Sequence, residues 1–107
     1  MKMVRIIIRP EKTKEVRDAL EAAGFAAVTE MDVYGRGKQK GITIGNVKYD
    51  ELPKIMLFMI IEDEDEEKVC RIILEKARTG EGNIGDGRIF VIPVEKAYTI
   101  SSGTEGL

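Results

Sequence analysis

An unbroken apolar run at residues 55–61 limits the possible folds of this chain more than any other feature of its sequence. Successive side chains of a strand point to opposite sides, so a strand here places apolar side chains on both faces of its sheet. Residues 88–94 show the same two-sided pattern. Burial of apolar surface contributes about 25 cal/mol per Å², so leaving either face in water would cost many kcal/mol. We therefore expect both faces of the sheet to be covered.

The other periodic segments predict a cover for one of these faces. Apolar residues recur at helical spacing from Val16 to Ala23 and again from Val69 to Ala77, whereas residues 25–34 keep one side polar, as an edge strand does. The predicted elements, in order, are a strand at 4–8, a helix from Pro10 to Gly24, strands at 25–34 and 55–61, a helix through 69–77, a strand at 88–94 and a short extra strand within 95–100.

Strand, helix and strand thus occur twice in succession, with helical segments of similar length. This order predicts an α+β fold, the ferredoxin-like split βαβ sandwich, as a single domain over residues 1–107. In that architecture both helices lie on one face of the sheet. Since the second face is also apolar, we expect another subunit to cover it. The C-terminal tail, residues 101–107, is the alternative cover, but it is short and polar.

Composition excludes several classes of function. The chain has no histidine, which removes the commonest general base and the usual zinc ligand, so we do not expect an enzyme. The 17 Lys and Arg residues are balanced by 19 Asp and Glu residues, which disfavours a nucleic-acid partner. The single cysteine, Cys70, has no internal disulfide partner and is predicted to be a packing residue. This lone cysteine and an N-terminal apolar run too short for a signal peptide favour a cytoplasmic protein. No apolar stretch is long enough to cross a bilayer, so we expect no membrane insertion.

Two glycine-rich loops that carry cations are the candidate binding segments, at residues 35–41 and 80–88. Glycines let the backbone approach an anion closely, and Lys or Arg supplies the opposite charge, so such loops suit phosphates. Neither loop matches a named nucleotide fingerprint, and simple flexible turns remain the alternative. The acidic run 62–67 lacks the pattern of a calcium loop and is better explained by the favourable dipole at a helix N-terminus.

Four segments, in order, resemble the sequence marks of the PII signal-transduction family of nitrogen regulatory proteins. They are Gly37-Lys38-Gln39-Lys40-Gly41, Leu52-Pro53-Lys54, Thr79-Gly80 and Ile84-Gly85-Asp86-Gly87-Arg88-Ile89-Phe90. The resemblance covers essentially the whole chain. It implies a trimer of ferredoxin-like subunits whose sheets pack inward, with nucleotide in the cleft between neighbouring subunits.

The resemblance also implies site residues for three ligands. ATP or ADP would be bound by Thr29, Gly35, Gly37, Lys38, Gln39, Ile60, Gly85, Asp86, Gly87 and Arg88, with Thr29 and Ile60 bordering the adenine. The effector 2-oxoglutarate would be bound by Gln39, Gly41, Lys54 and Gly85, with Lys54 pairing with a carboxylate. A magnesium ion, held by Gln39 and the nucleotide phosphates, would bridge the two ligands.

The resemblance further implies a partner and a means of controlling it. Residues 40–52 correspond to the family's T-loop, which contacts target proteins, although the loop is shorter here. The segments 31–42, 49–54 and 97–100 are similar to an archaeal subgroup encoded beside nitrogenase genes. Nitrogenase is therefore the expected target of a homotrimer, which could also act with a related PII subunit. Alternatives are control of an ammonium transporter or of glutamine synthetase and, from another class, a small phosphoryl-transfer enzyme.

The chain departs from the family where two arginines usually face the nucleotide phosphates. Thr99 and Ser101 stand at these positions. We therefore expect a phosphate site with less positive charge and a weaker affinity for ATP.

Overall fold

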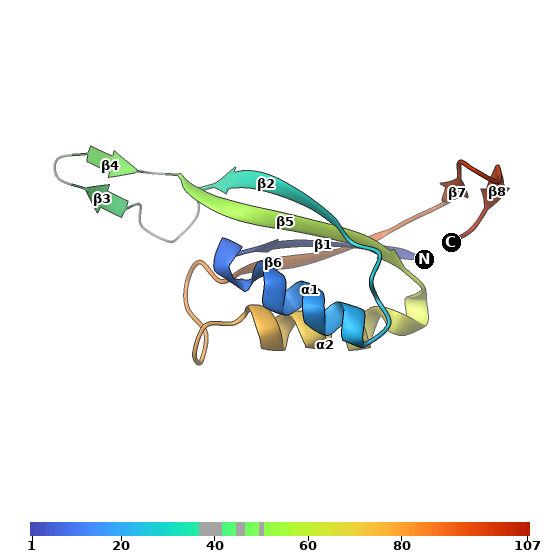
Figure 1. Ribbon diagram of the computed structural model, residues 1–107, viewed down its shortest axis with the longest axis horizontal. Coiled ribbons are helices and arrows are strands. Elements are labelled where there is room, and N and C mark those ends of the chain that lie inside the picture. Colours follow the sequence, from blue (N-terminus) through green and yellow to red (C-terminus); the bar gives the residue numbers. More distant parts are fainter. Residues whose placement is uncertain (37–41, 45–46, 50) are drawn as a thin grey trace.

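The computed structural model describes residues 1–36, 42–44, 47–49 and 51–107. Figure 1 shows a helix layer beneath a sheet layer, with short strand pairs projecting at both ends. The elements are β1 (Lys2–Ile8), η1 (Pro10–Lys12), α1 (Thr13–Ala22), β2 (Thr29–Gly35), β3 (Ile42–Ile44), β4 (Val47–Tyr49), β5 (Leu52–Ile61), η2 (Asp63–Asp65), α2 (Glu66–Ala77), β6 (Gly87–Pro93), β7 (Tyr98–Thr99) and β8 (Thr104–Glu105).

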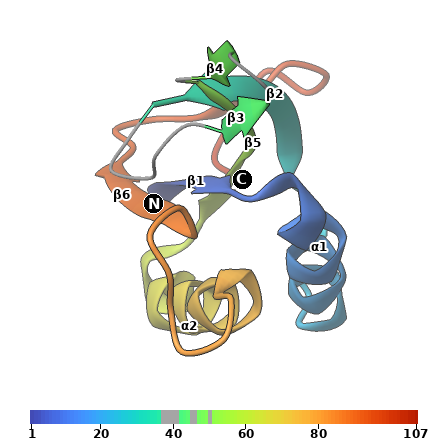
Figure 2. The same ribbon diagram turned by 90° about the vertical axis from the view of Figure 1, so that its left-hand side faces the viewer.

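The main sheet has the strand order β2-β5-β1-β6, and every neighbouring pair is antiparallel. Its two central strands are β1 and β5, and β2 lies at an edge, as its polar side predicted. Helices α1 and α2 lie side by side against one face of the sheet (Figure 2). The ferredoxin-like sandwich expected from the order of elements is therefore confirmed.

The core lies between the helices and the sheet. Its buried side chains come from alternate positions of the strands and from one stripe of each helix, as an amphipathic pattern requires. They are Val4, Ile6, Ile8, Val16, Leu20, Ile55, Leu57, Met59, Ile61, Val69, Ile73 and Ala77. None of the buried residues in the described part of the chain is polar or charged.

The face of the main sheet that points away from the helices, here called the open face, is also largely apolar. Met56, Phe58 and Ile60 alternate with the core residues of β5 and are only half-buried. Phe90 is 42% exposed and Ile92 is 38% exposed. The C-terminal hairpin β7–β8 lies beyond the end of the sheet (Figure 1), so it leaves the centre of the open face uncovered.

The prediction that residues 25–34 form one strand is wrong for residues 25–28. Gly24 ends the first helix with a positive φ of 94°, and the N–H of Phe25 donates to the carbonyl of Leu20 at 2.8 Å. This bond caps the helix, and Phe25 packs against the core. The backbone N–H of Phe25 therefore caps the helix instead of pairing with a strand, and β2 begins only at Thr29.

One further strand boundary differs from the predictions, and two other predicted segments contribute short strands. Strand β5 begins at Leu52 rather than Ile55, because β2 runs on to Gly35 and pairs with it there. The predicted T-loop, residues 40–52, contains the two paired strands β3 and β4. The extra strand expected within 95–100 is β7, which pairs with β8 and not with the main sheet.

Replacing Gly87 by Ala should destabilise the fold by more than about 2 kcal/mol. Gly87 has a φ of 112°, and an added Cβ would lie 1.8 Å from the carbonyl oxygen of Ile7 on the neighbouring strand. Gly106→Ala is the matched control, because Gly106 has a φ of 113° with no atom within 4 Å of the added Cβ. Urea unfolding of both variants tests the prediction, and equal losses of stability would contradict it.

Candidate functional site

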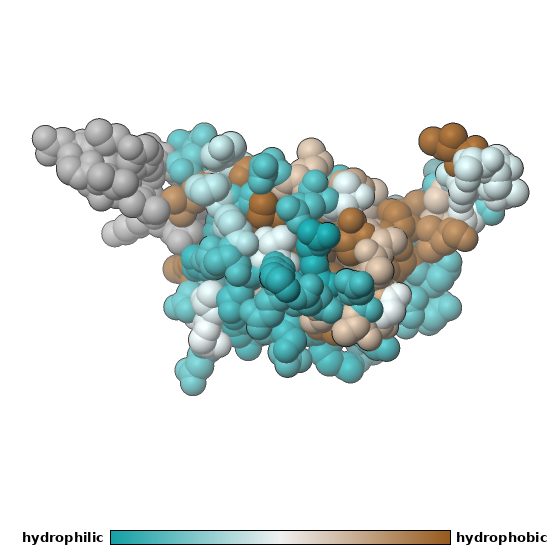
Figure 3. All heavy atoms as spheres, in the orientation of Figure 1, coloured by the Kyte–Doolittle hydropathy of each residue, from teal (hydrophilic) through white to brown (hydrophobic). Residues whose placement is uncertain are grey.

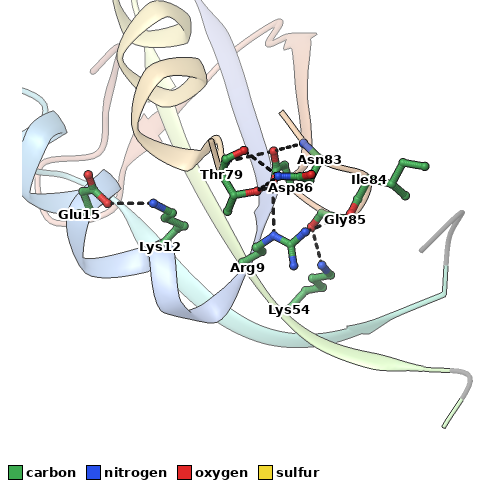
Figure 4. Close-up of polar contacts among 9 residues, drawn as sticks. All are labelled: Arg9, Lys12, Glu15, Lys54, Thr79, Asn83, Ile84, Gly85 and Asp86. Carbon is green, nitrogen blue, oxygen red and sulfur yellow. Dashed lines mark hydrogen bonds and ion pairs between the residues drawn. The ribbon is translucent and has the colours of Figure 1, made fainter. Parts of the chain in front are cut away.

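The loop that connects α2 to β6 is wrapped around the carboxylate of Asp86. Its Oδ1 accepts hydrogen bonds from Thr79 Oγ1 at 2.5 Å and from Arg9 Nε at 3.0 Å. Its Oδ2 accepts from the backbone N–H groups of Thr79 at 3.1 Å and Asn83 at 2.9 Å. Figure 4 shows these donors converging on one side chain. Both oxygens of Asp86 are therefore engaged in holding the loop.

This environment changes the acidity of Asp86. Burial alone would raise the pKa of the carboxyl group, but the hydrogen bonds from Thr79, Asn83 and Arg9 outweigh it and hold the pKa well below its usual range. Asp86 is thus ionised at any physiological pH and forms a partly buried ion pair with Arg9, in which each side chain is 17% exposed.

Two cations from the sheet bind consecutive carbonyl groups of the same loop. Arg9, directly after β1, donates from its second guanidinium nitrogen to the carbonyl of Ile84 at 3.0 Å. Lys54, in the part of β5 that extends beyond β1, donates to the carbonyl of Gly85 at 2.6 Å. Burial lowers the pKa of Lys54, and the nearby charge of Arg9 lowers it further. The two side chains approach the loop from the same side (Figure 4).

An open cleft of about 540 Å³ lies beside this loop. Among the described residues, its cationic side chains are Arg36, Lys54 and Arg88, and its apolar wall includes Ile7 and Phe90. The described residues that line it are Ile7, Gly35, Arg36, Leu52, Lys54, Asn83, Ile84, Gly85, Asp86, Gly87, Arg88 and Phe90. Among these described residues, Asp86 alone carries a carboxylate, and this group already accepts four hydrogen bonds.

The cleft brings together residues that the sequence predicted to act jointly. Of the predicted nucleotide and oxo-acid residues, the cleft gathers Gly35, Lys54, Gly85, Asp86, Gly87 and Arg88. Gly37, Lys38, Gln39 and Gly41 lie outside the described residues. Thr29 and Ile60 are on the open face of the sheet, away from the lining of this cleft.

Sequence reasoning missed the residues that shape the loop, namely Arg9, Thr79 and Asn83 as contacts of Asp86. Asn and Asp are common in turns, so the spacing of Asn83 and Asp86 in a glycine-rich segment carried a weak signal. Nothing in the sequence pairs Arg9 with Asp86, which is 77 residues away.

The arrangement suits the binding of an anion with several oxygens. Gly85 and Gly87 have φ values of 100° and 112°, which keep this part of the loop free of side chains. Arg88 and Lys54 add positive charge, so the described residues fit a phosphorylated ligand. No group of three or more His, Cys, Asp or Glu side chains able to hold a metal occurs in the described residues. Among these residues, no helix has the length and apolar character needed to span a membrane.

Comparison with known proteins identifies the family. The family described as "Nitrogen regulatory protein P-II" matches residues 1–104. The chain is 60% identical, over the full length of both, to "Nitrogen fixation nifHD2 region GlnB-like protein 1" of Methanosarcina barkeri. It is 55% identical, again over both full lengths, to "Nitrogen fixation nifHD region GlnB-like protein 1" of Methanothermobacter marburgensis. It is also 43% identical to "Nitrogen regulatory protein P-II 2" of Methanothermobacter thermautotrophicus, with 99% of this chain and 94% of that protein covered.

The chain belongs to the PII family of nitrogen regulatory proteins. The fold, the glycine-rich loop and the family assignment thus agree with the resemblance seen in the sequence. They define a regulatory protein. Archaeal proteins similar to it carry names that refer to nitrogen-fixation gene regions.

Replacing Asp86 by Asn should lower the free energy of unfolding by about 2–4 kcal/mol at pH 7, because a partly buried Arg9 would lose its charged partner. The folded-state pKa of Asp86 is lowered, so its stabilising contribution is complete above the unfolded pKa of about 3.9 and is lost as the pH falls below that value. The difference in unfolding free energy between the parent and Asp86→Asn should therefore become smaller at acidic pH.

Urea unfolding at pH 7 and at a series of lower pH values measures this difference. Asp18→Asn is the control, because it removes an exposed ion pair with Lys14 on α1 and should change stability little. If the difference in unfolding free energy between the parent and Asp86→Asn stayed constant down to strongly acidic pH, the charge of the Asp86 carboxylate would not be what organises the loop.

Proposed function

We propose that this protein is a trimeric sensor that binds ATP or ADP, Mg²⁺ and 2-oxoglutarate, and that controls nitrogenase through its T-loop. The observation that carries the proposal is the cleft in which Gly35, Lys54 and Arg88 meet the loop from Gly85 to Gly87. Cations and bare backbone converge there around an open space. The family assignment and the names of similar proteins support the regulatory class.

A trimer is supported by the positions of the remaining nucleotide residues. Thr29 and Ile60 lie on the open face, whereas Thr99 lies in the hairpin beyond the opposite end of the sheet from the T-loop (Figure 1). One chain cannot bring these residues to its own cleft. Copies that associate through their open faces could do so, and the association would also bury the apolar side chains of β5 and β6. A related PII subunit could take the place of one copy.

The proposed oxo-acid site is built on Lys54. Its ammonium group donates to the carbonyl of Gly85 at 2.6 Å, so it is held beside the glycine-rich loop. A carboxylate of 2-oxoglutarate would supply an opposite charge to a cation whose pKa is lowered by burial and by Arg9. Gln39 and Gly41, which lie outside the described residues, complete the proposed site together with Mg²⁺. The ion would contribute positive charge between the phosphates and the oxo-acid.

The target is inferred from the similar proteins whose names place them in nifHD regions. The proposed T-loop, residues 40–52, ends at the cleft. Its last residue, Leu52, lines the cleft, and so does Lys54 two residues further along β5. A ligand bound there would therefore act on the base of the segment that contacts the target. In this proposal, 2-oxoglutarate relieves the restraint that the protein places on nitrogenase.

Lys54→Ala should weaken 2-oxoglutarate binding at least tenfold while changing ATP binding little, since a charged hydrogen bond contributes about 1.5–3 kcal/mol. The parent should bind 2-oxoglutarate appreciably only with MgATP present, and each ligand should strengthen the other by the same factor. Calorimetric titrations with ATP, ADP and 2-oxoglutarate, singly and combined, measure both effects. Lys14→Ala, an exposed lysine on α1, is the control.

A nitrogenase assay extends the same test to the target. The parent should inhibit nitrogenase, and MgATP with 2-oxoglutarate should relieve the inhibition. Lys54→Ala should still inhibit but should no longer respond to 2-oxoglutarate. Equal losses of ATP and oxo-acid affinity in Lys54→Ala would contradict the division of roles, and a parent without effect on nitrogenase would contradict the target.

Replacing both Thr99 and Ser101 by Arg should strengthen ATP binding by about tenfold or more, because two charged hydrogen bonds would replace neutral ones of about half the strength. The gain should be greater for ATP than for ADP and should decrease as salt is added. Ser102→Arg, in the same hairpin, is the control for added charge alone. If the double variant bound ATP no more tightly than the parent, the inferred contacts between this hairpin and the phosphates would be withdrawn.

A further inference from the structure

The open face of the main sheet carries positive charge and no matching negative charge. The strand register places the following residues on this face: Met3, Arg5 and Ile7 of β1, Thr29, Met31 and Val33 of β2, Lys54, Met56, Phe58 and Ile60 of β5, and Arg88, Phe90 and Ile92 of β6. Three of them are cationic, and none of these described residues is acidic. Apart from Thr29, the residues named here are therefore apolar or cationic.

Arg5 occupies the centre of this face. It lies on the central strand β1, where its cross-strand neighbours are Phe58 on one side and Phe90 on the other. Directly opposed residues of antiparallel strands have Cβ atoms about 4.5–5.5 Å apart, so two phenyl rings flank the arginine. Lys54 and Arg88 belong to the cleft, whereas Arg5 is not part of its lining.

The guanidinium of Arg5 has no carboxylate partner among the described residues. The hydrogen bond it does make is to the sulfur of Met3 at 3.9 Å, and a thioether is a weak acceptor. The nearest acidic strand, β2, places Glu30 on the helix side, where it pairs with Arg17 of α1 at 3.0 Å. The carboxylate of Glu30 therefore cannot form an ion pair with Arg5 of the same chain.

Association of copies through the open face would take Arg5 out of water. A buried cation without a counter-charge is strongly unfavourable. Each added copy brings the same face, and therefore brings further cations and no carboxylate from that face. The apolar side chains favour association, whereas the arginines oppose it, and an anion bound between them would offset that cost.

We propose that the assembled protein has a second anion site, separate from the cleft, in which Arg5 side chains of adjoining copies bind a tetrahedral oxyanion of the phosphate class. The planar guanidinium donates in a fork that matches two oxygens of such an ion. One multiply charged anion bound by two or more arginines would offset the repulsion between their positive charges. This inference depends on the proposed association through the open face.

The test compares assembly in phosphate and in chloride at equal ionic strength, without nucleotide. Sedimentation velocity over a dilution series measures the dissociation constant of the assembly. We expect millimolar phosphate to lower that constant by about tenfold or more, the effect of one charged hydrogen bond or more. An unchanged dissociation constant in phosphate would overturn the inference.

Arg5→Met identifies the residue responsible, because it keeps a long flexible side chain and removes the charge. This variant should assemble in chloride at least as tightly as the parent does in phosphate, and phosphate should have no further effect on it. Arg5→Lys, which keeps the charge without the fork, should respond to phosphate more weakly than the parent. Arg71→Met makes the same change of net charge at an exposed ion pair on α2, and should keep the full phosphate effect.

The outcomes separate this inference from the proposed function. If phosphate strengthened the assembly of Arg5→Met as much as that of the parent, the anion would be acting in the cleft or elsewhere, and the Arg5 site would be overturned while the trimer stood. If the parent and all variants stayed monomeric in both salts, the proposed association itself would fail, and the Arg5 site with it.

Discussion

The helices α1 and α2 cover one face of the main sheet, and the apolar character of both faces determines how the chain folds and how it can associate. The side chains of the covered face form the core together with those of the two helices, and the core residues include Val4, Leu57 and Ala77. The other face keeps Met31, Phe90 and Ile92 at 38–48% exposure in a single chain. Figure 3 shows apolar side chains at the surface around the right-hand half of the sheet and along the segment leading to the C-terminal hairpin. A chain with this sheet is therefore suited to association, and the candidate site lies beside the face that would form such an interface.

The Arg9–Asp86 ion pair and the hydrogen bonds from Arg9 and Lys54 to loop carbonyls join the candidate site to the sheet. The loop before β6 contains several glycines with positive φ, including Gly80 and Gly85, and such residues lose much conformational freedom on folding. Four hydrogen bonds to Asp86 offset that loss. One of the four comes from Arg9, whose place is set by the pairing of β1 with β5 and β6. The shape of the ligand loop therefore depends on the register of strands that do not themselves line most of the cleft.

The fold could be predicted from local periodicity, and the site could be predicted only in part. The apolar run at 55–61 predicted a strand, and β5 contains it. Residues 25–28 were misassigned because the capping of α1 by Phe25 competes with strand pairing, and an alternating pattern does not show that competition. The bond between Arg9 and Asp86 joins residues 77 apart, so it depends on tertiary register that composition and spacing do not contain.

Lys54 links the cleft to the segment expected to meet the target. It lies where β5 has passed the end of β1 and is paired only with β2, so this part of the sheet has two strands and fewer constraints than its centre. Its ammonium binds the carbonyl of Gly85, and thereby connects the loop before β6 to the base of residues 40–52. A carboxylate that paired with Lys54 would either share the ammonium with Gly85 or displace the carbonyl. In both cases the ligand would change the contact between Lys54 and Gly85, which joins the loop before β6 to the base of residues 40–52. Arg9 would still hold Ile84 and Asp86, so the change would be confined to this contact.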